Sequence, residues 1–308
     1  MKAVKITLAI AVVGLIAFFV IKSLIFSDGP TKVTAPKNLF TERIEKEITA
    51  IAQLPENKFC PDTYKNVKYL IDDYYNSQRL GKNQSENDQW KENLSKELYS
   101  AYADQFIKQA FFVFNGSEWS SENLKFIRSE YQVLKKSPFL ENGSPVDNSF
   151  SKIRQILGKY DEIVSFISSC KGFSFSDYSL SSTFPVSDVQ NKISRARAYR
   201  NSNLENGYVN NCVRLHNQLK EIPQSFFNAH IRYLKNKISN WSNMWCNYNS
   251  HKDYSQNLYN PLRNEINDID NYSNIYNVPN FASEYNNLLQ IWSNDNKKAY
   301  NATYPCNQ

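Results

Sequence analysis

The stretch FSKIRQILGKYDEIVSFI, residues 150–167, carries an apolar side chain at every third or fourth position. Because an α-helix completes a turn in 3.6 residues, side chains with this spacing lie on one face of a helix. The stretch therefore predicts an amphipathic helix that buries one face. The residues of the predicted face are Phe150, Ile153, Leu157, Tyr160, Val164 and Ile167.

The same spacing recurs along most of the chain. Only 8 of the 308 residues are glycine, which suits long helices better than the many tight turns of a sheet fold. We therefore expect an all-α fold, in which an N-terminal transmembrane helix is followed by an elongated multi-helix bundle of long antiparallel helices. Further apolar stripes predict helices near residues 44–51, 64–74, 90–106, 124–134, 189–219, 227–269 and 281–292.

The pattern divides the chain after the N-terminal segment into three parts. Residues 40–170 form a predicted first helical subdomain, and residues 187–308 form a second. Between them, residues 171–186 alternate phenylalanine with serine and have no helical stripe. This Ser/Phe-rich segment predicts an irregular connection that lies against the bundle.

Three features of the second subdomain lead to specific expectations. Pro223 is expected to end a helix, because proline has no backbone N–H and fits poorly in a helix interior. The apolar stripe from Phe227 to Tyr248 predicts one long helix. His230 lies on this stripe and is expected to be a half-buried helix residue rather than a catalytic group.

The N-terminal segment MKAVKITLAIAVVGLIAFFVIKSLIFS, residues 1–27, predicts a signal-anchor transmembrane helix, and residues 28–39 a linker. As a helix, residues 6–26 are about 31 Å long, enough to cross a hydrocarbon core of roughly 30 Å. No small-residue cleavage site follows, so we expect the lipid bilayer to retain this segment. Lys2 and Lys5 favour a cytoplasmic N-terminus. The bulk of the chain should then be periplasmic or extracellular.

The five cysteines can form disulfides if the chain is exported. Cys246 and Cys306 lie about equally far from a predicted turn near Val278, so an antiparallel helical hairpin would bring them together. Such a bridge would close a loop of about 60 residues and contribute on the order of 4 kcal/mol. The alternative is that the cysteines are reduced and buried as small apolar groups.

A basic cluster on one predicted helix could receive an anionic glycan, lipid headgroup or acidic partner. The alternative is an ordinary solvated helix face. The cluster consists of Lys192, Arg195, Arg197 and Arg200.

A group of aromatic residues near the end of the stripe that begins at Phe227 could form a contact surface for sugars or peptides, since neighbouring asparagine amides suit such ligands. The alternative is that these rings belong to a helix interface. The group consists of Trp241, Trp245 and Tyr248.

Several kinds of chemistry lack their usual motifs. The chain has 3 histidines and no glycine-rich phosphate loop, zinc-protease motif or serine-hydrolase motif, so we expect no cofactor, no metal and no enzymatic activity. A formal net charge of +6 gives no strongly basic stripe, which argues against nucleic-acid binding. The sequence favours a membrane-anchored scaffold or accessory protein that binds protein partners of the cell envelope. The alternative is a surface module that binds glycans.

Overall fold

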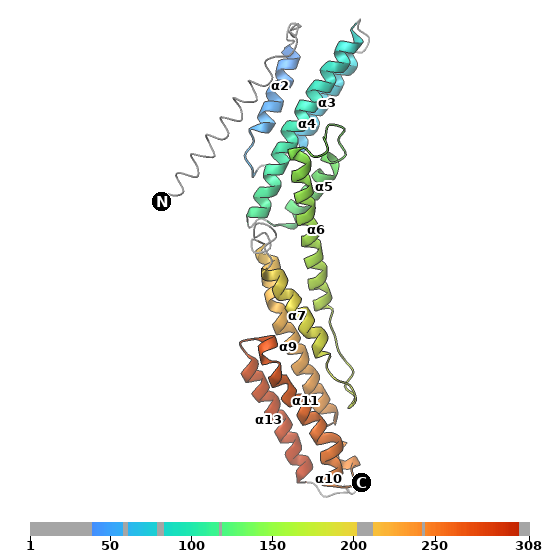
Figure 1. Ribbon diagram of the computed structural model, residues 1–308, viewed down its shortest axis with the longest axis vertical. Coiled ribbons are helices and arrows are strands. Elements are labelled where there is room, and N and C mark those ends of the chain that lie inside the picture. Colours follow the sequence, from blue (N-terminus) through green and yellow to red (C-terminus); the bar gives the residue numbers. More distant parts are fainter. Residues whose placement is uncertain are drawn as a thin grey trace, which may run out of the picture.

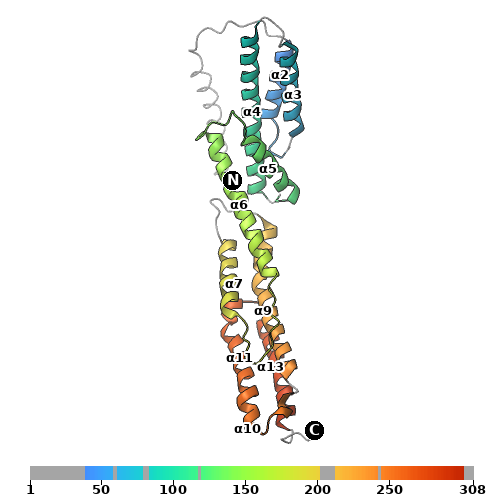
Figure 2. The same ribbon diagram turned by 90° about the vertical axis from the view of Figure 1, so that its right-hand side faces the viewer.

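The computed structural model describes residues 39–57, 61–78, 83–116, 119–201, 212–241 and 244–301. All regular secondary structure in these ranges is helical, and they contain no strand. The helices form a rod of two bundles stacked end to end, as the two views in Figure 1 and Figure 2 show. The predicted all-α helical bundle is therefore confirmed for the described residues.

The N-terminal bundle is built around α4 (Gln84–Asn115), which contacts the other four helices of this bundle. Tyr102 of α4 stacks on Tyr64 with ring centroids 4.3 Å apart, and its buried hydroxyl donates a hydrogen bond to Glu130 at 2.8 Å. The ring contact and the hydrogen bond tie α4 to two neighbours at one level of the core. The other helices are α2 (Leu39–Ala52), α3 (Pro61–Gln78), α5 (Ser121–Leu134) and α6 (Pro145–Lys171).

The C-terminal bundle places long helices side by side along the rod axis (Figures 1 and 2). Phe227, at the centre of this bundle, is fully buried and contacts the rings of Tyr276 and Phe281 at centroid distances of 5.4 and 5.1 Å. The chain turns between these two partners, where Asn277 adopts a left-handed conformation with φ of 46°. The main helices are α7 (Val186–Asn201), α9 (Val213–Trp241), α11 (Asn260–Asn271), α12 (Ser273–Tyr276) and α13 (Phe281–Tyr300).

The long helix α6 joins the two bundles, because it contacts α4 in one and α9 in the other. Near its middle, Asp161 accepts hydrogen bonds from both terminal guanidinium nitrogens of Arg128 on α5, each at 2.7 Å. The next residue, Glu162, accepts a hydrogen bond from the hydroxyl of Tyr199 on α7. Adjacent residues of a helix point in different directions. One side of α6 is therefore held by the N-terminal bundle and another side by the C-terminal bundle.

The buried face of α6 differs in part from the predicted stripe. Val164, predicted to be buried, is 36% exposed, whereas its neighbours Ile163 and Phe166 are buried. A helix with partners on two sides buries a wider face than a single stripe, which explains the additional buried positions.

The prediction that Pro223 ends a helix is wrong, since α9 runs through this residue. A proline in a helix interior costs about 3 kcal/mol because it removes one backbone hydrogen bond and crowds the preceding turn. Ile222 and Phe226 are buried on either side of the proline, and α9 packs against α6 and α7. Burial on both sides of Pro223 holds the two halves of the helix in line.

The prediction of one long helix from Phe227 to Tyr248 is also wrong at the C-terminal end of the helix, because α9 ends at Trp241. The following segment is rich in serine and asparagine, residues that favour caps and turns over helix interiors. Ser250 caps the next helix by accepting a hydrogen bond from the Asp253 amide at 3.2 Å. The short elements before α11 are the 3₁₀-helix η1 (Met244–Asn247), α10 (His251–Tyr254) and the π-helix η2 (Ser255–Tyr259).

The predicted signal anchor at residues 1–27, with its span at residues 6–26, lies outside the described residues. Among the helices that the structure does describe, none is both long and apolar enough to cross a bilayer. Membrane anchoring therefore stays a prediction.

Candidate functional site

The irregular connection between α6 and α7 lies across α9. Phe184 in this connection stacks on the His230 ring, with centroids 4.1 Å apart and an interplanar angle of 5°. Phe173 and Phe175 meet Phe226 and Tyr233 of α9 edge to face. As predicted, the segment is irregular and lies against the bundle. Its position fixes the side chains of a polar cluster in the C-terminal bundle.

Lys237 is the centre of this polar cluster and is 2% exposed. Its ammonium group donates to Glu265 of α11 at 2.6 Å, to the Ser182 carbonyl oxygen at 2.6 Å and to the Tyr233 hydroxyl at 3.0 Å. A lysine ammonium has three N–H donors, and here each donor has an acceptor. The cluster therefore ties α9, α11 and the connection together through one buried charge.

His230, about two helical turns before Lys237, is also buried, at 2% exposure rather than the predicted half-burial. Its Nδ1 atom is 2.9 Å from the Tyr276 hydroxyl. Burial lowers the pKa of His230 to about 3, so the ring is neutral at physiological pH, and burial also raises the pKa of Tyr276. The neutral imidazole keeps one nitrogen, Nε2, without a hydrogen-bond partner among the described residues.

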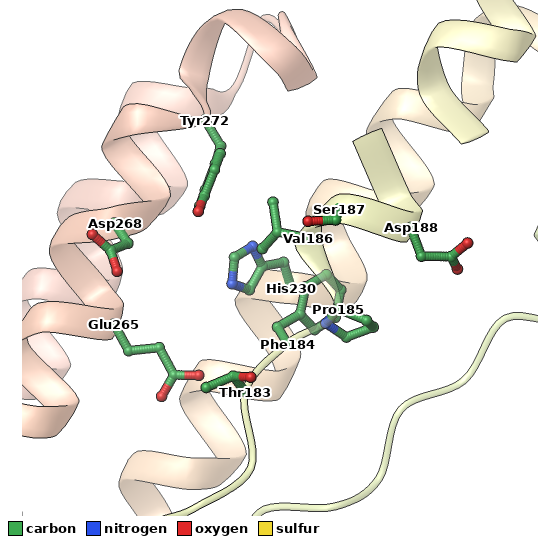
Figure 3. Close-up of a pocket in the computed structure, with 10 residues that line it drawn as sticks. All are labelled: Thr183, Phe184, Pro185, Val186, Ser187, Asp188, His230, Glu265, Asp268 and Tyr272. Carbon is green, nitrogen blue, oxygen red and sulfur yellow. The ribbon is translucent and has the colours of Figure 1, made fainter. Parts of the chain in front are cut away.

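A hollow of about 420 Å³ lies between the connection, the start of α7, and α11. In Figure 3 the His230 ring faces the α11 side chains across this hollow, the Tyr272 hydroxyl points into it, and the Asp188 carboxylate points away. Glu265 uses Oε2 to pair with Lys237, but its buried Oε1 has no partner among the described residues. The lining residues are Thr183, Phe184, Pro185, Val186, Ser187, Asp188, His230, Glu265, Asp268 and Tyr272.

The hollow thus presents hydrogen-bond acceptors beside a short apolar wall. Signals for this hollow in the amino-acid sequence are weak, because Lys237 and Glu265 look like ordinary solvated helix residues. Their third partner, Ser182, belongs to the irregular connection, whose path no periodic pattern predicts. The position of His230 on the apolar stripe predicts a helix residue, but nothing in its local sequence indicates that Phe184 covers it.

The predicted basic cluster is largely engaged within the chain. Lys192 pairs with Asp188 at 3.0 Å, and Arg197 donates to the Ile275 carbonyl oxygen at 2.6 Å. Arg195 donates to the Tyr199 hydroxyl at 2.6 Å. Arg200 is partly exposed at the end of α7. These contacts leave little free positive charge for an anionic partner, and a binding role for the cluster stays a prediction.

The predicted aromatic surface does not form one exposed helix stripe. Trp241 is on α9 and donates its indole N–H to the Tyr178 carbonyl oxygen at 2.8 Å, whereas Trp245 is on η1. Tyr248 packs edge to face on Tyr254 at 6.1 Å. All three of the predicted surface residues are partly buried against the core. This arrangement agrees better with packing than with a flat platform for a sugar.

No disulfide joins two of the described cysteines, because Cys170 and Cys212 are buried free thiols. Cys246 is disulfide-bonded. The predicted partner, Cys306, lies in the part of the chain that is not described, so the pair stays a prediction.

The buried charge of Lys237 generates a first prediction. Replacing Lys237 by Met leaves the Glu265 carboxylate without its cation and should lower the free energy of unfolding by about 3 to 5 kcal/mol. Lys235→Met is the matched control, because Lys235 pairs with Glu284 at 3.1 Å while both side chains are about one-third exposed. The control should cost less than about 1 kcal/mol. Urea unfolding followed by circular dichroism measures both, and equal losses would contradict the importance of the buried pair.

The pH dependence of stability provides a second prediction. The His230 pKa falls from 6.5 to about 3 on folding, so the unfolded chain binds the proton more tightly between these pH values. Stability linked to His230 is therefore complete above about pH 6.5 and is lost as the pH falls toward 3, with a slope approaching about 1.4 kcal/mol per pH unit.

His230→Gln should remove this contribution. The slope of the unfolding free energy against pH should then decrease between pH 6.5 and 3, by up to about 1.4 kcal/mol per pH unit, which corresponds to one proton. Tyr276→Phe is the control, because it removes the hydrogen bond but keeps the titrating ring; it should lower stability and keep the slope. Identical slopes for wild type and His230→Gln would show that the ring is not held neutral.

Comparison of the chain with protein-family models, with curated proteins and with solved structures finds no match.

Proposed function

We propose that this chain is a membrane-anchored, extracytoplasmic helical scaffold or accessory protein that acts through protein contacts in the cell envelope. The observation that carries the proposal is the rod shape with a continuous core. Buried apolar residues extend as one cluster from Ile44 in α2 to Ala299 in α13. A rod of this kind exposes long helix faces at two ends and along its length, which suits extended contacts with partners better than enclosure of a substrate.

The bonding state of Cys246 supports the extracytoplasmic part of the proposal. Structural disulfides persist in oxidising compartments and are rare in the cytosol. The rings of His251 and Tyr300 lie 5.5 Å apart, so the chain just after Cys246 meets the end of α13. This proximity favours Cys306, six residues beyond Tyr300, as the partner that we propose for Cys246. The apolar segment at residues 6–26 is the proposed bilayer anchor.

The alternative, a surface glycan-binding module, has less support. A glycan-binding surface requires exposed aromatic rings. The rings of Trp241, Trp245 and Tyr248 are instead partly buried against the core. The scaffold is therefore the preferred proposal.

Site-specific photo-cross-linking in the native cell tests the proposal. A photoreactive amino acid replaces Tyr69 in α3 or Tyr300 at the end of α13, which are 69% and 72% exposed and lie in different bundles. A reporter that is active only outside the cytoplasm is fused after Gln308. We expect reporter activity and adducts to discrete membrane or envelope proteins. A photoreactive residue at the buried Phe227 is the control and should give no adduct to another protein.

An inactive but well-expressed reporter would contradict the extracytoplasmic location. A functional reporter with no adduct at either exposed position would contradict the scaffold role, since a scaffold must contact its partners through such faces.

A further inference from the structure

The hollow beside His230 combines three features that point to a ligand. The first is a set of acceptors without partners, namely Glu265 Oε1 and His230 Nε2, within the described part of the chain. Leaving the buried Glu265 Oε1 without a hydrogen bond is unfavourable, so a donor that reaches this oxygen is favoured. His230 is 2% exposed and its ring faces the hollow in Figure 3.

The second feature is the charge of the lining. Lys237 neutralises Glu265, and Lys192 neutralises Asp188 at the edge. Asp268 forms no ion pair within the described ranges and accepts only a long hydrogen bond of 3.4 Å from the Asn271 amide. With His230 neutral, the lining carries one negative charge in excess. A ligand with a single positive charge balances it.

The third feature is the shape. Phe184, Pro185 and Val186 form an apolar wall next to the acceptors, and the hollow of about 420 Å³ falls within the range of small-molecule sites. No three histidine, cysteine, aspartate or glutamate side chains in the described ranges converge as metal ligands. The lining therefore fits a cation that has its own N–H donors and an aliphatic stem better than a bare metal ion.

We infer that this hollow binds the primary ammonium group of a small aliphatic amine. The ammonium N–H groups donate to Glu265 Oε1 and to His230 Nε2, and the stem lies on the wall formed by Phe184 and Val186. Asp268 and the Tyr272 hydroxyl stand on the α11 side and supply the charge and a further acceptor. The His230 tautomer that accepts at Nε2 is the one that donates from Nδ1 to the Tyr276 hydroxyl.

Isothermal titration calorimetry on the full-length chain in detergent tests the inference. The probes are n-pentylamine and Nα-acetyl-lysine amide, and the neutral control is 1-hexanol. We expect at least one amine to bind with a dissociation constant on the order of 1 mM or tighter, and the alcohol not to bind measurably. Binding of pentylamine alone indicates a free amine as ligand. Tighter binding of the lysine amide indicates a lysine side chain.

Two variants on the same helix separate a specific site from general attraction. Asp268→Asn removes the unpaired charge of the hollow and should weaken amine binding about tenfold. Asp270→Asn removes the same charge from an exposed residue of α11 that does not line the hollow, and should change the affinity less than about twofold. Neither exposed position is part of the core, so both variants should fold.

Three results would overturn the inference. One is the absence of heat from both amines at concentrations well above 1 mM. Another is equal binding of amine and alcohol, which would show an apolar hollow filled without regard to charge. The last is equal weakening by the two aspartate variants, which would show diffuse attraction of cations to the surface.

Discussion

The structure depends on one helix that serves two bundles. α6 is held on one side by the ion pair between Asp161 and Arg128, and on another by the hydrogen bond between Glu162 and Tyr199. Hydrogen bonds from Lys159 and Tyr199 lower the pKa of Glu162 to about 2, so this acceptor stays ionised. Because α6 continues without a break through the junction, the bundles share a core and cannot rotate freely about a linker. The scaffold proposal rests on this continuity.

The C-terminal bundle differs from a simple apolar core because it contains a buried charge. The Lys237 ammonium gathers acceptors from α11 and from the irregular connection, and its neighbour His230 is covered by Phe184. Buried polar clusters of this kind are costly unless every group is satisfied. Here the lysine is satisfied, whereas Glu265 keeps a buried oxygen, and His230 a ring nitrogen, without a hydrogen bond among the described residues. The cluster thus both positions the connection and leaves a polar site at the surface of the rod.

Apolar periodicity was sufficient to predict the helical class, the elongated bundle and the turn near Val278. It failed where local signals compete with packing. Pro223 predicts the end of a helix, but burial of the neighbouring Ile222 and Phe226 keeps α9 continuous. The polar site could not be predicted, because Ser182 and Phe184 reach Lys237 and His230 through the path of an irregular segment. Sequence patterns report which face is apolar, and they do not report which charged residue a loop will cover.

If the two bundles form one stiff rod, the distance across their junction is fixed, and it can be measured. Spin labels carried by unnatural amino acids at the exposed Tyr69 in α3 and Tyr300 at the end of α13 report this distance by pulsed electron paramagnetic resonance. A reference pair within one bundle, Tyr69 and the exposed Val133, sets the width expected for labels on a rigid body. For a stiff rod we expect one distance, with a distribution about as narrow as that of the reference pair. A broad or multiple distribution across the junction, with a narrow reference, would contradict it.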